Sequence, residues 1–227
     1  MTLSRRQQNR IDRERQILSA AMQVFSDAGY SGASMDAIAA AAGISKPTLY
    51  QYFDSKDALF AAMMRGFRNE MLDVFEHPSP AGMVADLHAF AWDYADTVMR
   101  PDMLSLARLI IGEVQRFPEI GRQFQESGPD RLLQGMMAWL DARRAEGLLS
   151  FDDAELAAED LWGLILSAPR NQALHRPDRV PARADLQRYI DNGLRVFLRA
   201  YSTQPETDLA ALRALTELPP PPPTGDA

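Results

Sequence analysis

Two lysines stand where a helix is expected to begin, and an anion would complete each site. Lys46 follows the expected N-cap Ser45, and Lys56 follows Ser55. A cation in the first turn opposes the helix dipole, whereas the free N–H groups at the same place attract anions such as phosphate. Tyr50 lies between the two lysines and can donate to a phosphate oxygen, although packing against its own domain explains it equally well. The expected chemistry is recognition of a polyanion.

The residues around these lysines predict a helix, a turn and a second helix. Ser34 is expected to cap the first helix, which ends at Gly43, where a left-handed backbone costs a glycine little. Ser45 caps the second helix, expected over residues 46–53, and Pro47 lies in its first turn. This order is the helix-turn-helix pattern. Leu49 and Phe53 are expected to point inward, and the exposed positions are Lys46, Pro47, Thr48, Gln51 and Tyr52.

The run from Gly43 to Phe60, GISKPTLYQYFDSKDALF, resembles the DNA-binding domain of TetR/AcrR-type transcriptional regulators. The resemblance includes the preceding residues Ala20, Ala21, Phe25, Gly29, Tyr30 and Ser34. It implies that the major groove would be faced by Lys46, Pro47, Thr48, Gln51 and Tyr52, and that phosphates would be held by Ser34, Tyr50 and Lys56. The chain departs from many relatives, which carry glycine at the position of Pro47 and histidine at Gln51 or Tyr52.

Composition excludes several other classes of protein. The 227 residues are 46% hydrophobic and contain no cysteine, so disulfide frameworks and cysteine zinc fingers are excluded. His77, His88 and His175 form no metal-ligand pair at helical spacing, and we expect neither a metal nor a cofactor. No apolar run is long enough to span a membrane, and the N-terminus MTLSRRQQNR has no export signal, so the expected location is cytoplasmic.

The net charge of −7 is unevenly distributed along the chain. Residues 1–70 hold nine Lys or Arg against seven Asp or Glu, and the remainder holds fifteen against twenty-four. Only residues 1–70 do not carry a net negative charge. Their first arginines could form a basic arm or frayed turn that follows DNA, although a solubilising tail explains Arg5 and Arg6 equally well; these arginines are Arg5, Arg6, Arg10, Arg13 and Arg15.

Hydrophobic periodicity predicts helices on both sides of the motif. A first packing helix is expected over residues 12–28, ending at Gly29. After the motif, apolar residues from Leu59 to Phe75 trace one face of a helix over residues 56–75. This helix would join the two halves of the protein, so a tilt at one end would move the other.

The rest of the chain predicts an all-α fold without a convincing strand. Helices are expected over residues 82–99, 102–117, 129–147, 153–175 and 183–201. The segment from Ile110 to Leu149 resembles the C-terminal domain of AefR/AcrR-like members of the same family, which implies ligand binding and dimerisation. The predicted organisation is a helix-turn-helix domain at 10–56, a helical ligand-binding and dimerisation domain at 57–203, and a proline-rich tail at 204–227 that is expected to be disordered. Within the tail, a short helix is expected at residues 206–218, before the five prolines 219–223.

Two sets of apolar residues bear on ligand binding and dimerisation. An ordinary core explains any one of them, but together the aromatic and methionine side chains suggest a pocket; the candidates are Phe90, Tyr94, Ile110, Met136, Met137, Trp139, Trp162 and Asn171. The last two long helices carry apolar faces wider than one domain needs to cover itself. The resemblance assigns them to a four-helix dimer interface, with Leu161, Leu164, Ile165, Ala168, Ile190, Leu194 and Phe197 as candidates.

The sequence thus predicts a homodimeric transcriptional regulator, a repressor that binds a palindromic operator in double-stranded DNA. A small apolar or amphipathic effector would release it. A carboxylate-bridged di-iron enzyme is disfavoured because no histidine has a glutamate three residues before it, so we expect no enzymatic activity. A helical scaffold that binds only protein stays open, but it would give Lys46, Tyr50 and Lys56 no purpose.

Overall fold

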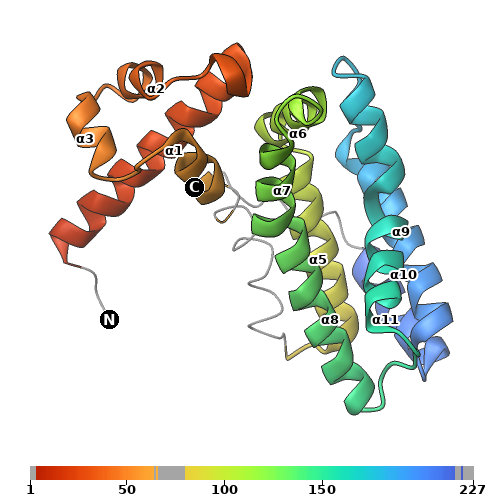
Figure 1. The fold of residues 1–227 in the computed structure, drawn as a ribbon. Helices are drawn as coiled ribbons and strands as arrows, with labels where there is room; N and C mark the ends of the chain where they lie inside the picture. The colour runs from red at the N-terminus through yellow and green to blue at the C-terminus, as the bar shows by residue number, and fades with distance from the viewer. Residues whose placement is uncertain (1–3, 64, 66–79, 218–220, 222–227) are drawn as a thin grey trace. The chain divides into compact units, whose positions relative to one another are not determined.

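In the computed structural model, residues 4–63, 65, 80–217 and 221 are described, and they are mainly helical (Figure 1). No β-strand occurs among them, although Leu149 and Ser202 form an isolated antiparallel bridge. Besides a helical segment at residues 56–63, the helices are α1 (Arg5–Gly32), α2 (Met35–Ala41), α3 (Lys46–Tyr50), α5 (Met83–Val98), α6 (Pro101–Glu113), α7 (Pro118–Ser127), α8 (Pro129–Ala145), α9 (Ala154–His175), α10 (Arg183–Tyr201) and α11 (Pro205–Thr216). The predicted all-α fold is confirmed.

The chain divides into two compact units whose limits differ from the predicted domain limits. The first unit comprises residues 1–66 and 101–128, and the second comprises residues 67–100 and 129–227. Helices α6 and α7 therefore group with the helix-turn-helix elements, because α6 packs along α1 and α7 packs on α6. Helix α7 was not resolved by the sequence pattern, which predicts one helix to residue 117 followed by a break.

The predicted caps of the helix-turn-helix are confirmed. The Ser34 hydroxyl accepts from the Ala37 N–H at 3.2 Å, and the Ser45 hydroxyl accepts from the Thr48 N–H at 3.2 Å. Gly43, between the helices, has a φ of 64°, a backbone that side-chain-bearing residues rarely adopt. Helix α3 ends at Tyr50 rather than residue 53, and a turn follows it.

Helix α1 begins earlier and ends later than predicted. Ser4 and Gln7 bond reciprocally, each side chain accepting from the other's backbone N–H, and this capping box fixes the start of the helix. The five arginines that were expected to form a basic arm or frayed turn lie on the exposed surface of α1, so from Arg5 onward the chain is helical rather than a frayed turn or the disordered tail considered for Arg5 and Arg6. Gly29, with a φ of 71°, interrupts the helical geometry near the end of α1.

An aromatic cluster forms the centre of the first unit. Phe25 and Tyr30 of α1 stack with ring centroids 5.5 Å apart, and the Phe60 ring meets each of them edge-on. Leu49 of α3 is fully buried and Phe53 is 7% exposed, as their spacing predicts. Burial of Leu49 and Phe53 on one side leaves the opposite side of α3 at the surface.

The second unit is a bundle of α5, α8, α9, α10 and α11. Helix α9 packs along α8 and α10, while α10 and α11 both pack on α5. Gly193 lets α10 approach α9 closely, since a Cβ there would lie 2.7 Å from the Leu164 backbone oxygen. The long axes of α9 and α10 are therefore fixed against each other by backbone contact.

Burial corrects most of the predicted dimer interface. Five of its residues have no exposed surface within the single chain and form the core of the bundle; they are Leu161, Ile165, Ile190, Leu194 and Phe197. A side chain without exposed surface has none to bury against a partner, so these five are core residues. Leu164 is half-buried and Ala168 is exposed.

The short helix predicted at residues 206–218 is confirmed, so the first part of the segment from residue 204 is ordered. Residues 205–216 form α11, whose Leu209 and Leu212 are buried. Arg183, at the start of α10, forms a 2.5 Å ion pair with Asp96 of α5, and its Nε donates to the Pro221 carbonyl at 2.8 Å. Tail residues therefore bury apolar area and make hydrogen bonds with the rest of the unit.

The helix predicted to join the two halves, residues 56–75, is described only at residues 56–63 and 65; the remainder lies outside the described residues. Within the described part, the segment begins at Ser55, whose hydroxyl accepts from the Ala58 N–H at 3.1 Å. Across the ranges that the structure covers, no helix has the length and apolar character needed to cross a membrane.

Candidate nucleic-acid interface

The surface of α3 carries the residues predicted to read DNA bases. Lys46, Pro47 and Gln51 are exposed, and Thr48 and Tyr52 are half-buried. The Thr48 hydroxyl lies 2.7 Å from the Ser45 hydroxyl, so the N-cap already holds this side chain. Gln51 and Tyr52 project from the turn after α3, since the helix ends at Tyr50.

Lys46 is paired within the protein. Its Nζ lies 2.7 Å from Oδ1 of Asp36, in the first turn of α2, and both side chains are more than half exposed. The hydrogen bond to Asp36, followed by its charge, raises the pKa of Lys46 above its ordinary value. Lysine has three donors, so this pair leaves others for an acceptor on DNA. Sequence patterns predicted that Asp36 and Lys46 each lie in the first turn of a helix, but they did not reveal that the two side chains pair.

The predicted phosphate contacts fall into two groups. Ser34 and Tyr50 are exposed, with Tyr50 at 43%, and they lie at the start of α2 and the end of α3. Lys56 is half-buried: its Nζ donates to the Tyr30 carbonyl at 2.9 Å and lies 4.4 Å from the centre of the Tyr30 ring. A phosphate that binds Lys56 would contact an ammonium group that already donates to Tyr30, whereas Ser34 and Tyr50 would contact a phosphate directly at the surface.

Two contacts that position this site were missed by sequence reasoning. The Tyr30 hydroxyl donates to the Asp57 carboxylate, which ties the end of α1 to the segment that follows the helix-turn-helix. The Gln16 amide donates to the Ala42 carbonyl at 2.9 Å, which holds the turn between α2 and α3 against α1. Both pairs are about 26 residues apart in the chain, and no short spacing could have revealed them.

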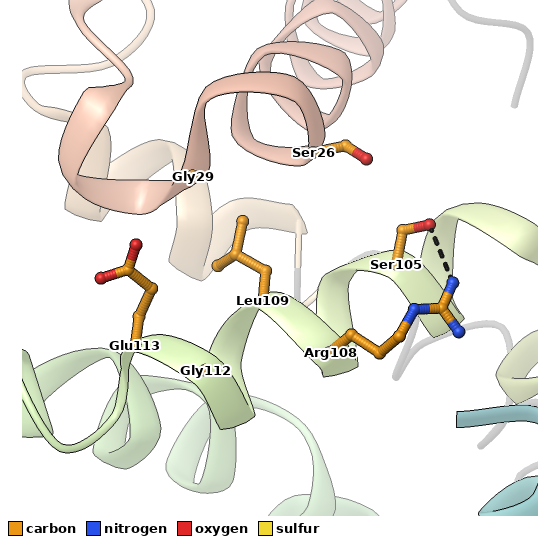
Figure 2. A pocket seen from close by; sticks show the side chains of 7 residues that line it. All are labelled: Ser26, Gly29, Ser105, Arg108, Leu109, Gly112 and Glu113. Atoms are coloured by element: carbon orange, nitrogen blue, oxygen red, sulfur yellow. Dashed lines mark hydrogen bonds between the residues drawn. The ribbon is translucent and has the colours of Figure 1, made fainter. Parts of the chain in front are cut away.

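A cleft of about 470 Å³ lies between α1 and α6 within the first unit. Figure 2 shows Ser26 and Gly29 of α1 on one wall and α6 on the other, where Arg108 and Glu113 lie on either side of Leu109. The Arg108 guanidinium donates to the Ser105 hydroxyl at 3.3 Å. Sequence reasoning did not find this cleft, because it depends on α6 packing against α1.

The candidate ligand-pocket residues are distributed over both units. Ile110 lies in α6, in the first unit, and Asn171 is exposed on α9 of the second unit. Met136 and Trp139 of α8 are buried and Met137 is half-buried. The remaining three candidates, Phe90, Tyr94 and Trp162, contact one another.

Phe90, Tyr94 and Trp162 form an aromatic cluster between α5 and α9. The Phe90 and Tyr94 rings stack with centroids 5.9 Å apart, and Trp162 meets Tyr94 edge-on at 5.5 Å. Burial raises the pKa of Tyr94 to about 12, so its hydroxyl keeps its proton at neutral pH. Phe90 has no exposed surface, Tyr94 is 5% exposed and Trp162 is half-buried, so this cluster is part of the packed interior of the second unit.

Comparison with known proteins covers both halves of the chain. The family model for bacterial regulatory proteins of the tetR family matches residues 17–63. The model for the AefR-like transcriptional repressor C-terminal domain matches residues 85–203, more than half of the chain.

Curated relatives align over part of their length. The HTH-type transcriptional activator FasR of Mycolicibacterium smegmatis is 52% identical over 56 residues, which are 25% of this chain and 26% of FasR. The HTH-type transcriptional regulator RutR of Escherichia coli is 34% identical over 113 residues, 49% of this chain and 46% of RutR. The chain thus aligns with less than half the length of either relative.

Solved structures match over nearly their whole length. A TetR-family regulator from Mesorhizobium loti is 31% identical, with a TM-score of 0.71, and the match covers 85% of this chain and 98% of that one. The flavonoid-responsive regulator FrrA is 33% identical, with a TM-score of 0.67 and the same coverage of both chains. The helix-turn-helix around α3 and the helical C-terminal unit therefore have one explanation: the chain belongs to the TetR family of DNA-binding transcription regulators.

Proposed function

We propose that this chain is a homodimeric repressor that binds a palindromic operator through α3 and is released by a small apolar or amphipathic effector. Lys46, Pro47, Thr48, Gln51 and Tyr52 contact base edges in the major groove. Ser34, Tyr50 and Lys56 contact phosphates on either side.

The observation that carries the DNA-binding part is the presentation of α3. Leu49 is fully buried while Lys46, Pro47 and Gln51 are exposed, so one side of the short helix is anchored and the other faces solvent. Serine caps and a left-handed Gly43 fix the backbone at its start. A recognition helix needs this rigidity, because base readout depends on side chains held at fixed positions in the groove.

The dimer rests on the exposed face of α9 and α10 rather than on the buried residues predicted first. Leu156 of α9 is 63% exposed and Val196 of α10 is 39% exposed, so each has apolar surface that a partner could bury. Leu164, Ala168 and Gly163 add a half-buried leucine and two small residues to the solvent side of α9. A second copy packing on this face would bury them by two-fold symmetry.

Release by an effector is supported by the aromatic cluster of the second unit and by the relatives. FrrA is a flavonoid-responsive regulator, and the match extends over 98% of its chain. We assign the effector site to the neighbourhood of Phe90, Tyr94 and Trp162. The direction of regulation rests on the AefR-like repressor domain, whereas FasR is an activator.

Selection of genomic fragments bound by the purified protein tests the function. We expect enrichment of a palindromic sequence and an affinity that falls steeply with salt, since phosphate contacts release counterions. Fragments without a shared sequence, bound equally at low and high salt, would favour the scaffold that binds only protein. Effector coupling predicts reciprocity: an effector that weakens operator binding must itself bind more weakly, by the same factor, when operator is present.

A further inference from the structure

Glu113 of α6 brings a half-buried carboxylate to the cleft between α1 and α6. Its Oε1 lies 3.0 Å from the place that a Cβ on Gly29 would take, so the carboxylate lies against the end of α1. Figure 2 shows this side chain directed toward Gly29. Across the ranges that the structure describes, the Glu113 side chain makes no hydrogen bond or ion pair. A carboxylate that has lost part of its hydration without gaining a partner favours a cation beside it.

Arg108 carries the opposite charge on the other side of Leu109 in the same cleft (Figure 2). The guanidinium donates to the Ser105 hydroxyl at 3.3 Å, which holds it there, and Ser26 adds a hydroxyl from α1. The planar N–H fork of a guanidinium matches the two oxygens of a carboxylate. Arg108 and Glu113 are five residues apart, which is about 7.5 Å along the helix axis. The cleft therefore presents a cationic site and an anionic site with an aliphatic side chain between them.

Gly112 leaves open space on the α6 wall of this cleft. No described atom lies within 4 Å of the place that its Cβ would take, and its φ is outside the left-handed region. Neither packing nor backbone geometry requires a glycine there, although glycine is a poor helix former. The cleft volume of about 470 Å³ lies within the range of small-molecule sites in proteins, roughly 300–1,000 Å³. A ligand that uses the space beside Gly112 would account for the glycine.

We propose that the cleft between α1 and α6 binds a small zwitterion, with its carboxylate at Arg108 and its ammonium group at Glu113. A chain of methylene groups between the two charges lies over Leu109. The separation of Arg108 and Glu113 selects an ω-amino acid, whose charges stand at the two ends of the chain, over an α-amino acid. This site belongs to the first unit and goes beyond the proposed function, on which it does not depend.

Four probes test the proposal by isothermal titration calorimetry on the full chain. They are 6-aminohexanoate, hexanoate without the ammonium group, hexylamine without the carboxylate, and glycine with both charges close together. We expect 6-aminohexanoate to bind at least about tenfold more tightly than each of the other three, because only it reaches both charged side chains. Equal dissociation constants for 6-aminohexanoate and hexanoate, or for 6-aminohexanoate and glycine, would overturn the proposal.

Charge variants assign each end of the probe. Glu113→Gln should reduce the affinity for 6-aminohexanoate about tenfold, to that for hexanoate, without weakening hexanoate binding. Arg108→Gln should reduce it to the affinity for hexylamine. Glu126→Gln and Arg122→Gln are the matched controls, because both residues are exposed on α7 of the same unit and neither lines the cleft. If Arg108→Gln does not fold, Glu113→Gln decides the outcome: unchanged 6-aminohexanoate binding in a variant with unchanged thermal unfolding contradicts the proposal.

Gly112→Leu tests the cleft without changing a charge. The new side chain starts in open space, so the protein should unfold at the same temperature or higher, while the filled cleft should no longer bind 6-aminohexanoate. Binding that survives this substitution would place the probe elsewhere and overturn the site. All titrations are made without DNA, so their outcome is independent of whether the protein selects a palindromic operator.

Discussion

Lys56 donates a 2.9 Å hydrogen bond to the backbone carbonyl of Tyr30, and its Nζ lies 4.4 Å from the centre of the Tyr30 ring. The neighbouring Asp57 accepts from the Tyr30 hydroxyl. Two consecutive residues, Lys56 and Asp57, thus bind the backbone carbonyl and the hydroxyl of Tyr30. Lys56 fastens the DNA-binding elements to α1, and in the proposed function it also contacts a phosphate.

Lys56→Met should weaken binding to all DNA sequences equally and reduce the slope of log affinity against log salt by about one unit. It should also destabilise the protein by about 1–2 kcal/mol, because the hydrogen bond and the cation–π contact are lost. Salt titrations of DNA binding and urea unfolding measure the two effects. Tyr30→Phe is the control: it removes the bond to Asp57 but keeps the carbonyl and ring, so the salt slope should not change. A changed sequence preference with an intact slope would contradict the phosphate role.

Asp36→Asn should raise DNA affinity across all sequences, because it frees Lys46 and removes a negative charge beside α3. Asp178→Asn, on an exposed carboxylate of the second unit, changes the net charge equally and should have no such effect.

By contrast, Lys46→Ala and Gln51→Ala should alter the preference of the protein for particular base pairs of the operator, each costing about 1–3 kcal/mol. Binding to a panel of operator variants distinguishes a uniform change in affinity from a change at particular base pairs. If Gln51→Ala weakened binding to all operator variants equally, the assignment of Gln51 to base contacts in the major groove would be wrong.

Leu156→Glu combined with Val196→Glu should give a folded monomer, since both side chains are exposed in the single chain. Sedimentation equilibrium and circular dichroism measure association and helix content. Val180→Glu is the control, because Val180 is 50% exposed outside the helices. Leu194→Glu should instead unfold the second unit, as it places a charge in a fully buried site. If the double variant stays dimeric, the interface lies on another face.

Asp191→Asn should stabilise the protein at pH 7 but not at pH 4. Burial raises the pKa of Asp191 from 3.8 to about 6, opposed by the charge of Arg195. A folded pKa above the unfolded value means that ionisation opposes folding, so the penalty is absent below pH 3.8 and complete above pH 6. Because Asp191 is only half-buried, we expect a gain of about 1 kcal/mol in urea unfolding at pH 7. Equal gains at both pH values would assign the effect to packing rather than charge.

The sequence by itself determined the local features of this protein. Serine caps, a left-handed glycine and a proline in a first turn fix their helix ends through bonds within a few residues, so Ser34, Gly43, Ser45 and Pro47 lie where they were predicted. Apolar periodicity likewise located the long helices, and α10 was predicted with the bounds that it has. Neither kind of signal requires knowledge of a distant partner.

The tertiary structure alone decided which faces stay exposed and which charges are paired. Leu194 and Leu156 are both aliphatic residues on helices, yet the packing of α9 on α10 buries one completely and leaves the other 63% exposed. Lys56 and Arg170 are both cations, but the Lys56 Nζ donates to the Tyr30 carbonyl, whereas the Arg170 Nε is buried and makes no hydrogen bond with the described residues. Periodicity shows that a helix has an apolar side, but burial and pairing depend on residues far away in the chain that folding brings together.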